Sequence, residues 1–349
     1  MNGSVTLVSG HSALPMGQQH YESALRQSLA RCASAGWRIT VRRVVSLRSP
    51  VRGAIRLPTR ALSAAPYAAV APLAQLAYGR AQLVHRFDLR LPPRLGREVV
   101  TVHDLPPLRF DDEGSLPRWA LAGARQASGV ICPSEFAAHE VRALLGVRRV
   151  WVVPNGVSPE IALAMPIPGA ELAAKGIHGP FVLHAGGATR RKNLDALARA
   201  WTSVADRCPE AHLVLCGPPH PRRRQLFDKA ERVHDLGYLR PATVARLMRA
   251  AAAVVVPSMY EGFGLPALEG MAAGAPVVAA ETGALPEVCG DAALLVPATA
   301  DGILDGLLEV LQDGRRAARL RRLGPERAAM FSWARTAEET LAVYDEAIA

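Results

Sequence analysis

Two glutamates stand on either side of a Gly-Phe-Gly turn in the stretch PSMYEGFGLPALEGMAAGAPVV, which covers residues 257–278. Glu261 follows an apolar run typical of a buried strand, and Glu269 falls within a run that favours a helix. Free N–H groups where this helix begins, from Phe263 to Leu265, suit an anion such as a phosphate. The two carboxylates would repel a phosphate but accept hydrogen bonds from hydroxyls. The stretch therefore predicts a site for a ligand with a diphosphate between a sugar and a ribose.

Further blocks of the chain, taken in order, resemble one family. They are TVHDLPPL (101–108), ASGVICPSEFAAHEVRALLGV (127–147), VVPNGV (152–157), TRRKNLDALARAW (189–201), HDLGYL (234–239), PEVCGDAALLVP (286–297) and FSWARTAEETLAVY (331–344). With the two glutamates in an E-x7-E spacing, the chain is similar to the retaining glycosyltransferases of family 4, which have the two-domain GT-B fold. The resemblance covers most of the chain.

The resemblance implies a role for each matching position. Glu261 would hold hydroxyls of the donor sugar, and Glu269 would hold the ribose hydroxyls of the nucleotide. Arg191 and Lys192 would stabilise the diphosphate leaving group as its bond to the sugar breaks, although Arg191 also fits a solvated helix start. His103 would face the reacting carbon of the donor. The expected catalytic set is His103, Glu261, Lys192 and Arg191, and the expected donor-binding set is Gly17, Gly186, Leu236, Tyr238, Gly262, Phe263, Gly264, Leu265 and Glu269.

Some of these positions keep two interpretations. Tyr238 either packs on the nucleobase or belongs to the core, and Asp104 orients either His103 or the neighbouring loop. His20 and Tyr21 face either the acceptor or a surface or core environment. Relatives commonly have a glycine pair where this chain has Met16 before Gly17, and Arg190 could replace an arginine that some relatives carry before the lysine.

The elements that must position these residues follow an alternating order. Short β-branched runs such as SVTLVSG and EVVTVHD alternate with alanine- and leucine-rich runs of helical period, and the alternation restarts after a proline-rich stretch from about residue 154 to 180. This order predicts an α/β fold with two Rossmann-like, doubly wound parallel sheets facing a central cleft. We expect an acceptor-binding domain over residues 1–160, a donor-binding domain over 178–330, and a C-terminal helix (about 331–349) that packs back on the first domain.

The net charge of +10 is confined to one half of the chain. Residues 1–165 hold 20 basic and 10 acidic side chains, whereas residues 166–349 hold 21 of each. The densest basic run extends from Arg38 to Arg60, with seven arginines and no acid. It is either a solvated face or a surface for an anionic membrane or acceptor. Prolines at positions 50 and 58 argue against one continuous helix, and the scarcity of aromatic residues argues against nucleic acid.

Several classes of protein are disfavoured by the sequence. No strongly apolar window is long enough to span a bilayer, and residues 1–10 do not resemble a signal peptide. Five scattered cysteines without a CxxC spacing favour reduced thiols, so we expect a cytoplasmic protein, in contact with the inner membrane face if the arginine run binds lipid. The acidic residues 111–113 are expected to form a solvated loop, and the resemblance implies that neither a metal nor another cofactor is needed.

The predicted reaction is transfer of a hexosyl unit from a nucleotide-diphosphate sugar to a glycan or lipid-linked acceptor, with an α-linked product. GDP-mannose is the first candidate donor and UDP-glucose the second. A nucleotide-sugar epimerase of the same fold and a catalytically silent GT-B binding subunit remain alternatives. A phosphorylase is disfavoured because none of the three lysines has a recognisable pyridoxal-phosphate context.

Overall fold

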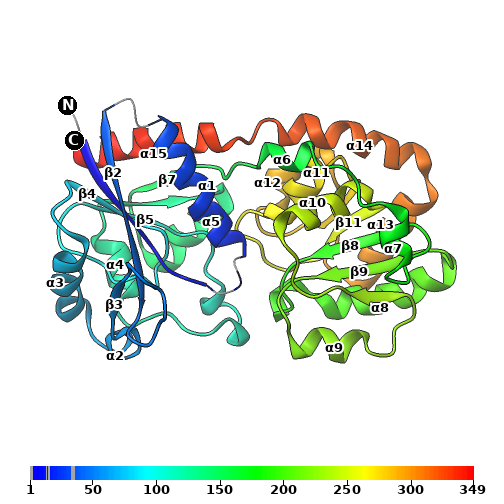
Figure 1. Ribbon diagram of the computed structural model, residues 1–349, viewed down its shortest axis with the longest axis horizontal. Helices are drawn as coiled ribbons and strands as arrows, with labels where there is room; N and C mark the ends of the chain where they lie inside the picture. Colours follow the sequence, from blue (N-terminus) through cyan, green and yellow to red (C-terminus); the bar gives the residue numbers. More distant parts are fainter. Residues whose placement is uncertain (1–2, 13, 15, 33–35) are drawn as a thin grey trace. The chain divides into compact units, whose positions relative to one another are not determined.

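The chain forms two compact units in the computed structural model, which describes residues 3–12, 14, 16–32 and 36–349. Unit 1 comprises Met1–Gly156 and Trp333–Ala349, and unit 2 comprises Val157–Ser332 (Figure 1). Residues 157–177, for which the proline-rich sequence predicts an irregular connection, belong to unit 2 and contain helices α6 (Pro159–Ala162) and α7 (Gly169–Ala173). The central cleft between the two domains stays a prediction.

Unit 1 contains a seven-stranded parallel sheet in the order β3-β2-β1-β4-β5-β6-β7. The strands are β1 (Gly3–Ser9), β2 (Trp37–Ser46), β3 (Ile55–Leu57), β4 (Leu83–Arg86), β5 (Glu98–Thr101), β6 (Gly129–Cys132) and β7 (Val150–Val152). Its α-helices are α1 (Gly17–Cys32), α2 (Thr59–Ser63), α3 (Tyr67–Tyr78), α4 (Ala120–Gln126), α5 (Glu135–Glu140) and α15 (Trp333–Ile348). The strand order reverses between β1 and β4, and such a switch point is where doubly wound sheets bind ligands.

Unit 2 contains a six-stranded parallel sheet in the order β10-β9-β8-β11-β12-β13. The strands are β8 (Phe181–Ala185), β9 (His212–Cys216), β10 (Val233–Asp235), β11 (Ala253–Val256), β12 (Val277–Ala280) and β13 (Leu294–Val296). Besides α6 and α7, its α-helices are α8 (Leu194–Arg207), α9 (Pro221–Phe227), α10 (Pro241–Ala250), α11 (Leu265–Ala272), α12 (Leu285–Cys289), α13 (Ala300–Gln312) and α14 (Gly314–Ala328). The switch point of this sheet lies between β8 and β11. Both sheets confirm the predicted α/β class.

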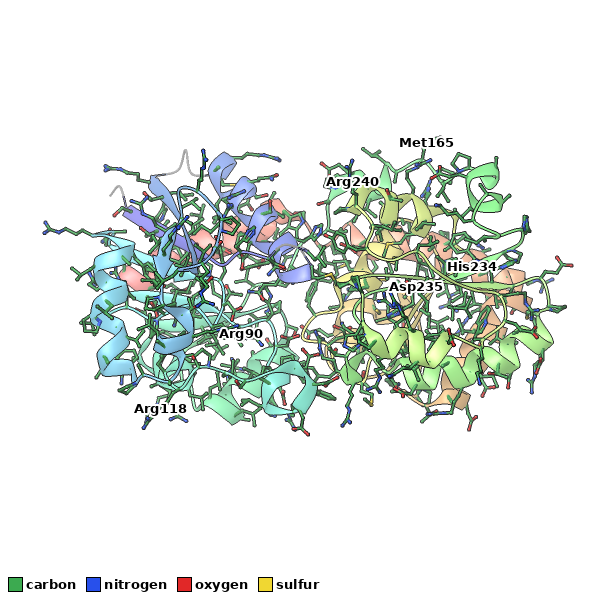
Figure 2. All side chains as sticks on the ribbon, turned by 60° about the horizontal axis from the view of Figure 1, so that its bottom comes forward. Arg90, Arg118, Met165, His234, Asp235 and Arg240 are labelled. Carbon is green, nitrogen blue, oxygen red and sulfur yellow. The ribbon has the colours of Figure 1, made fainter. Side chains whose placement is uncertain are left out.

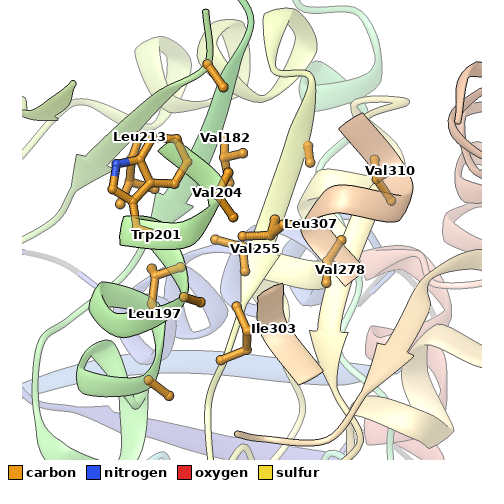
Figure 3. Close-up of a cluster of buried hydrophobic side chains, with 14 of the residues drawn as sticks. Val182, Leu197, Trp201, Val204, Leu213, Val255, Val278, Ile303, Leu307 and Val310 are labelled. Carbon is orange, nitrogen blue, oxygen red and sulfur yellow. The ribbon is translucent and has the colours of Figure 1, made fainter. Parts of the chain in front are cut away.

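The core of unit 2 lies between its sheet and helices α8 and α13 (Figure 3). Apolar residues of α8 recur at helical spacing, so that Leu197, Trp201 and Val204 face the strands. Ile303 and Leu307 of α13 cover the neighbouring part of the same sheet. This packing holds β8 and β11 in place, and the candidate site lies on the loops that follow these two strands.

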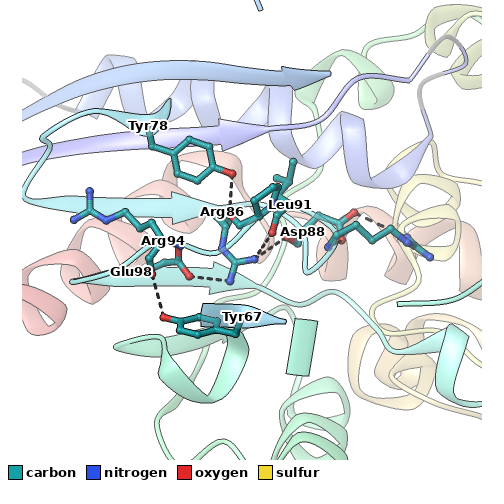
Figure 4. Close-up of polar contacts among 9 residues, drawn as sticks. Tyr67, Tyr78, Arg86, Asp88, Leu91, Arg94 and Glu98 are labelled. Atoms are coloured by element: carbon teal, nitrogen blue, oxygen red, sulfur yellow. Dashed lines mark hydrogen bonds and ion pairs between the residues drawn. The ribbon is translucent and has the colours of Figure 1, made fainter. Parts of the chain in front are cut away.

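Unit 1 has a buried ion pair between β4 and β5 (Figure 4). Arg86 Nη2 lies 2.8 Å from Glu98 Oε1, and Arg86 Nη1 donates to the Leu91 carbonyl at 2.7 Å. The other Glu98 oxygen accepts from the Arg94 backbone N–H at 2.9 Å. Removing one member of such a pair leaves an uncompensated buried charge, which costs about 3–5 kcal/mol. The pair therefore fixes the loop that connects the two strands.

Helix α15 packs beside α1 within unit 1. The Tyr344 hydroxyl lies 2.6 Å from His85 Nδ1, and the Trp37 indole donates to Asp345 Oδ1 at 3.0 Å. His85 Nε2 in turn lies 2.7 Å from the Thr101 hydroxyl. The last helix of the chain is thus joined by hydrogen bonds to strands β2, β4 and β5 of the first sheet.

The arginine run does not form one helix. Arg38, Arg42 and Arg43 lie on β2, Arg56 lies on β3, and Arg60 is the second residue of the short helix α2. All seven side chains of the run, including those of residues 48 and 52, are exposed. Among the described residues no helix is both long enough and apolar enough to cross a membrane. All five cysteines are free thiols.

Candidate active site

The Gly-Phe-Gly turn joins β11 to α11 in unit 2. Gly264 adopts φ +94° as the residue before α11, and a Cβ at this position would lie 2.6 Å from Leu285 Cδ2. Only glycine fits this combination of backbone angle and close approach. Pro266 occupies the first turn of the helix, and Gly274 follows the helix with φ +70°. The turn places Glu261 at the carboxyl end of the buried strand, as the sequence predicts.

Glu261 is a buried carboxylate with two cations beside it. Lys192 Nζ lies 2.7 Å from Glu261 Oε1, Arg191 Nη1 lies 3.6 Å from Oε2, and the Ser258 hydroxyl donates to Oε1 at 2.7 Å. Burial by itself raises the pKa of Glu261, but Lys192 and Arg191 outweigh that cost and hold the pKa below its ordinary value. Glu261 is therefore ionised at neutral pH and fixed between β8 and β11.

Asn193 fixes the loop that carries the two cations. It follows the 3-10 turn Arg190–Lys192 in a left-handed conformation with φ +55°. Its side-chain amide donates to the carbonyls of Pro257 at 2.9 Å and Ala298 at 3.0 Å. The loop after β8 is thereby attached to the loops after β11 and β13. Asn193 is not among the predicted site residues, although an asparagine directly before the helix pattern is a signal for such a role.

Three backbone donors lie beside this cluster. The N–H groups of Phe263, Gly264 and Leu265 have no protein acceptor in the part of the chain that the structure describes. The Phe263 ring is buried and contacts the Phe331 ring at a centroid distance of 5.9 Å. Three adjacent donors at the start of an eight-residue helix are suited to an anion or to sugar oxygens.

Glu269 lies about one turn into α11 and is half-buried. No hydrogen bond or ion pair to its carboxylate is found among the described residues. Desolvation raises the pKa of Glu269 to about 7. A carboxylate held in this way has unused acceptor capacity, which hydroxyl donors of a ligand can satisfy.

The loop after β10 is the predicted base-binding segment. Leu236 N–H donates to Leu215 O at 2.9 Å, and Gly237 N–H donates to Asp235 Oδ1 at 3.0 Å. Figure 2 labels His234 and Asp235 on β10, where this loop begins. Tyr238 is half-buried, so both interpretations of this side chain stay open.

In unit 1, His103 follows β5 and lies against Tyr21, with ring centroids 4.4 Å apart and planes at 81°. Its Nε2 atom is buried without a hydrogen-bond partner in the described structure. Desolvation lowers the pKa of His103 to about 4, with a small opposing effect of Asp88. His103 is therefore neutral at pH 7. Tyr21 is buried, which supports its core interpretation.

A polar group at the switch point of unit 1 was missed by sequence reasoning. Gln18 Nε2 donates to Asp88 Oδ2 at 2.9 Å and to Glu22 Oε1 at 3.3 Å. Glu22 is 7% exposed, and desolvation raises its pKa to about 7. Gly17, predicted to lie in the loop before the first helix, is instead the first residue of α1. Residues 13 and 15 of that loop lie outside the described residues.

The acidic residues Asp111–Glu113 form a 3-10 turn with no buried side chain. In the described ranges no group of three or more His, Cys, Asp or Glu side chains could hold a metal ion.

Two family descriptions match successive parts of the chain. Residues 19–161 match "Glycosyltransferase Family 4", and residues 179–313 match "Glycosyl transferases group 1". The fold is similar to that of sucrose-phosphate synthase from Thermosynechococcus elongatus, with a TM-score of 0.78 and 24% identity over 99% of this chain and 98% of that one. The two family matches show that the chain is a glycosyltransferase, and its two doubly wound parallel sheets have the GT-B fold.

Two curated relatives narrow the class to a family. O-antigen chain mannosyltransferase B of Escherichia coli is 30% identical over 287 residues, which are 75% of this chain and 74% of that protein. MMP alpha-(1->4)-mannosyltransferase of Mycolicibacterium hassiacum is 43% identical over 122 residues, 34% of this chain and 30% of that protein. The match to the second relative thus spans less than a third of its length. The chain belongs to glycosyltransferase family 4.

Proposed function

We propose that this glycosyltransferase moves a hexosyl unit from a nucleotide-diphosphate sugar to a hydroxyl of a glycan or lipid-linked acceptor, with retention and an α-linked product. The observation that carries the proposal is the cluster of Glu261, Lys192 and Arg191 beside three unpaired backbone donors. Mannose from GDP-mannose is the first candidate, because both relatives described above are named mannosyltransferases. Glucose from UDP-glucose is the second.

Donor binding would replace the contacts between the two cations and Glu261 with contacts to the donor. Both cations contact Glu261. The diphosphate would draw Lys192 and Arg191 toward its oxygens, and the sugar hydroxyls would donate to the Glu261 carboxylate in their place. Glu269 would accept the ribose hydroxyls. The positive charge for the leaving group then comes from side chains, so the proposal includes neither a metal nor another cofactor.

In the proposed reaction, the acceptor hydroxyl attacks the anomeric carbon on the face from which the diphosphate departs. The bond from that carbon to the phosphate oxygen breaks, the bond to the acceptor oxygen forms, and the departing phosphate takes the hydroxyl proton. Lys192 and Arg191 balance the charge that develops on the phosphate. Neutral His103 is proposed to hydrogen-bond the donor sugar through its unpartnered Nε2 atom.

The acceptor is proposed to meet unit 1. Its seven exposed arginines between residues 38 and 60 favour an anionic acceptor or an anionic lipid surface, in agreement with a cytoplasmic protein that contacts the inner membrane face. No nucleic-acid partner is included, because the run has no interleaved aromatic side chain on which bases could stack.

A binding and turnover screen tests the proposal. GDP-, UDP- and dTDP-sugars are each titrated against the wild type and Glu269→Ala, with thermal stabilisation and isothermal calorimetry as readouts. We expect one donor to stabilise the wild type and to bind the variant at least tenfold more weakly, because the ribose loses its acceptor. If no nucleotide sugar binds the wild type, the donor-site assignment is wrong.

The same screen separates the alternatives. Conversion of the bound nucleotide sugar to its epimer or to free sugar, without an acceptor, would indicate an epimerase. Binding without turnover across a panel of glycan and lipid-linked acceptors would indicate a silent binding subunit. Transfer to an acceptor hydroxyl, with an α-configured product by NMR, is the expected outcome.

A further inference from the structure

Arg223 is a fully buried arginine at the carboxyl edge of the sheet in unit 2. It lies on the short helix α9 between Arg222 and Arg224, within the run HPRRRQLF. Its exposure is 1%, whereas Arg224 is exposed and Arg222 forms an ion pair with Asp195 on α8. Burying a guanidinium costs several kcal/mol unless its donors and charge are satisfied. The contacts of Arg223 must therefore offset the cost of its burial.

These contacts join three loops that follow adjacent strands. Arg223 Nη2 donates to Gly186 O at 2.6 Å, in the loop after β8. Nη1 donates to the carbonyls of Gly217 and Pro218, each at 3.2 Å, in the loop after β9. Nη1 also lies 3.6 Å from Asp235 Oδ1 at the end of β10. One side chain thus holds the backbone on which the predicted diphosphate and base contacts lie.

The loops approach each other as closely as backbone allows. Gly186 N–H donates to Cys216 O at 2.9 Å, and Gly217 N–H donates to Gly237 O at 2.9 Å. A Cβ on Gly217 would lie 1.9 Å from Gly186 O and 2.7 Å from Arg223 Nη2. No side chain fits at position 217, because it would clash with both the Gly186 carbonyl and the Arg223 guanidinium.

The contact to Gly186 sets the direction of the next amide. In a trans peptide the carbonyl and the following N–H point in opposite directions. Because Gly186 O points to Arg223, the Gly187 N–H points away from the guanidinium. This N–H has no protein acceptor in the described ranges, and a Cβ on Gly187 would meet no atom within 4 Å. The hydrogen bond from a charged donor to the carbonyl also polarises the peptide and strengthens its N–H as a donor.

We propose that Arg223 is a positioning residue of the donor site, which orients the Gly186–Gly187 peptide so that the Gly187 N–H binds the diphosphate of the nucleotide sugar. Arg223 itself touches no ligand. This inference rests on the proposed function, since it requires a nucleoside diphosphate at the edge of unit 2. It adds a residue that lies outside the block TRRKNLDALARAW (189–201).

The test compares ligands that differ only in the diphosphate. Wild type, Arg223→Met and the matched control Arg224→Met are titrated with GDP and guanosine, and with UDP and uridine. For the base that the wild type prefers, we expect Arg223→Met to lower the affinity for the nucleoside diphosphate about tenfold. This is the effect of losing one charge-assisted hydrogen bond. The affinity of Arg223→Met for the nucleoside should fall by a clearly smaller factor. Arg224→Met should bind both ligands with wild-type affinity.

A purely structural role predicts a different result. If Arg223→Met lowers the melting temperature but its folded form binds diphosphate and nucleoside with an unchanged affinity ratio, the proposal is wrong. If Arg223→Met does not fold, Arg223→Lys decides, because it keeps the charge but replaces the planar guanidinium, whose separate nitrogens reach the loops after β8 and β9, with a single nitrogen. A wild-type affinity ratio in Arg223→Lys overturns the proposal, and a ratio lowered about threefold supports it. If the wild type binds no nucleoside diphosphate, the proposed function fails instead.

Discussion

The two units have the same strand order around their switch points, yet they assemble their polar groups differently. In unit 2 the catalytic candidates come from two loops, after β8 and β11, and each loop has a recognisable local motif. In unit 1 the polar group combines the start of α1 with residues that follow β4 and β5. Asp88 and Gln18 are 70 residues apart and contact each other only because β1 and β4 are neighbours.

Their electrostatics also differ. Unit 2 neutralises its buried carboxylate with Lys192 and Arg191, and the cluster lowers the pKa of Glu261. In unit 1 burial raises the pKa of Glu22 to about 7, although Arg43 and Arg26 act in the opposite direction. The basic excess of unit 1 is spread over exposed arginines instead. We infer that unit 2 uses charge at short range, as a leaving group requires, whereas unit 1 presents charge to a larger partner.

The largest expected effect concerns the ion pair that distinguishes the interior of unit 1. Arg86→Met should lower the free energy of unfolding of unit 1 by about 3–5 kcal/mol, because Glu98 is left buried without its partner. Urea denaturation in a Trp201→Phe background measures this, since the four remaining tryptophans all belong to unit 1. The control Arg97→Met changes an exposed arginine of the same segment. A loss below 1 kcal/mol would contradict the importance of the pair.

The next effect concerns the short-range charge of unit 2. Lys192→Met should lower kcat by about 10²–10³-fold, because a preorganised charge on the leaving group is lost. Lys175→Met, at an exposed lysine of the same unit, should retain wild-type kcat. Steady-state kinetics with saturating donor and acceptor provide the comparison. A loss of kcat below tenfold would show that Arg191 alone suffices.

A third prediction concerns pH and the stability of unit 2. The pKa of Glu269 is raised to about 7 in the folded chain, so folding favours the protonated carboxyl. Its contribution to the free energy of unfolding is therefore fully present below its ordinary pKa of 4.5 and is lost as pH rises through 7. Glu269→Gln avoids that loss and should be more stable than the wild type at pH 8, by at most about 3 kcal/mol. The difference should disappear near pH 4.5. Thermal unfolding between pH 4.5 and 8 measures it.

The same carboxylate predicts a pH dependence of binding. Ribose hydroxyls prefer the ionised form of Glu269, so affinity for a nucleotide sugar should fall as pH drops from 8 to 6. A nucleotide sugar is the appropriate probe, because its diphosphate has no terminal phosphate that titrates in this range. Glu269→Gln should lose this dependence and the exposed control Glu281→Gln should keep it. An unchanged profile in Glu269→Gln would assign the titration to another group.

The smallest expected effect concerns the arginine face of unit 1. Replacing Arg48, Arg52 or Arg56 singly by alanine should weaken binding to anionic phospholipid vesicles about fivefold, since each cation near the surface contributes about 1 kcal/mol. Arg224→Ala, at an exposed arginine of unit 2, is the control. Sedimentation with vesicles at low and physiological salt gives the affinities. If removal of all three leaves binding unchanged, the membrane proposal is wrong.

Local patterns in the sequence determined the order of strands and helices in both units. Alternating β-branched and helical runs predicted the two parallel sheets. The Gly-Phe-Gly turn predicted that Glu261 follows a strand and that Glu269 lies on the next helix. These features depend on neighbouring residues, which is why a single sequence shows them. The ion pair between Lys192 and Glu261 was less accessible, because it joins residues 69 positions apart.

Only the tertiary structure decided which of several equivalent residues enter a site. The run HPRRRQLF offers three consecutive arginines, and the sequence does not distinguish them. The direction of α9 against the sheet buries Arg223 between the loops after β8, β9 and β10, while it leaves Arg224 in solvent. Asp88 reaches Gln18 for the same reason, since β4 lies beside β1. Adjacency of strands is set by long-range packing, and local sequence carries no record of it.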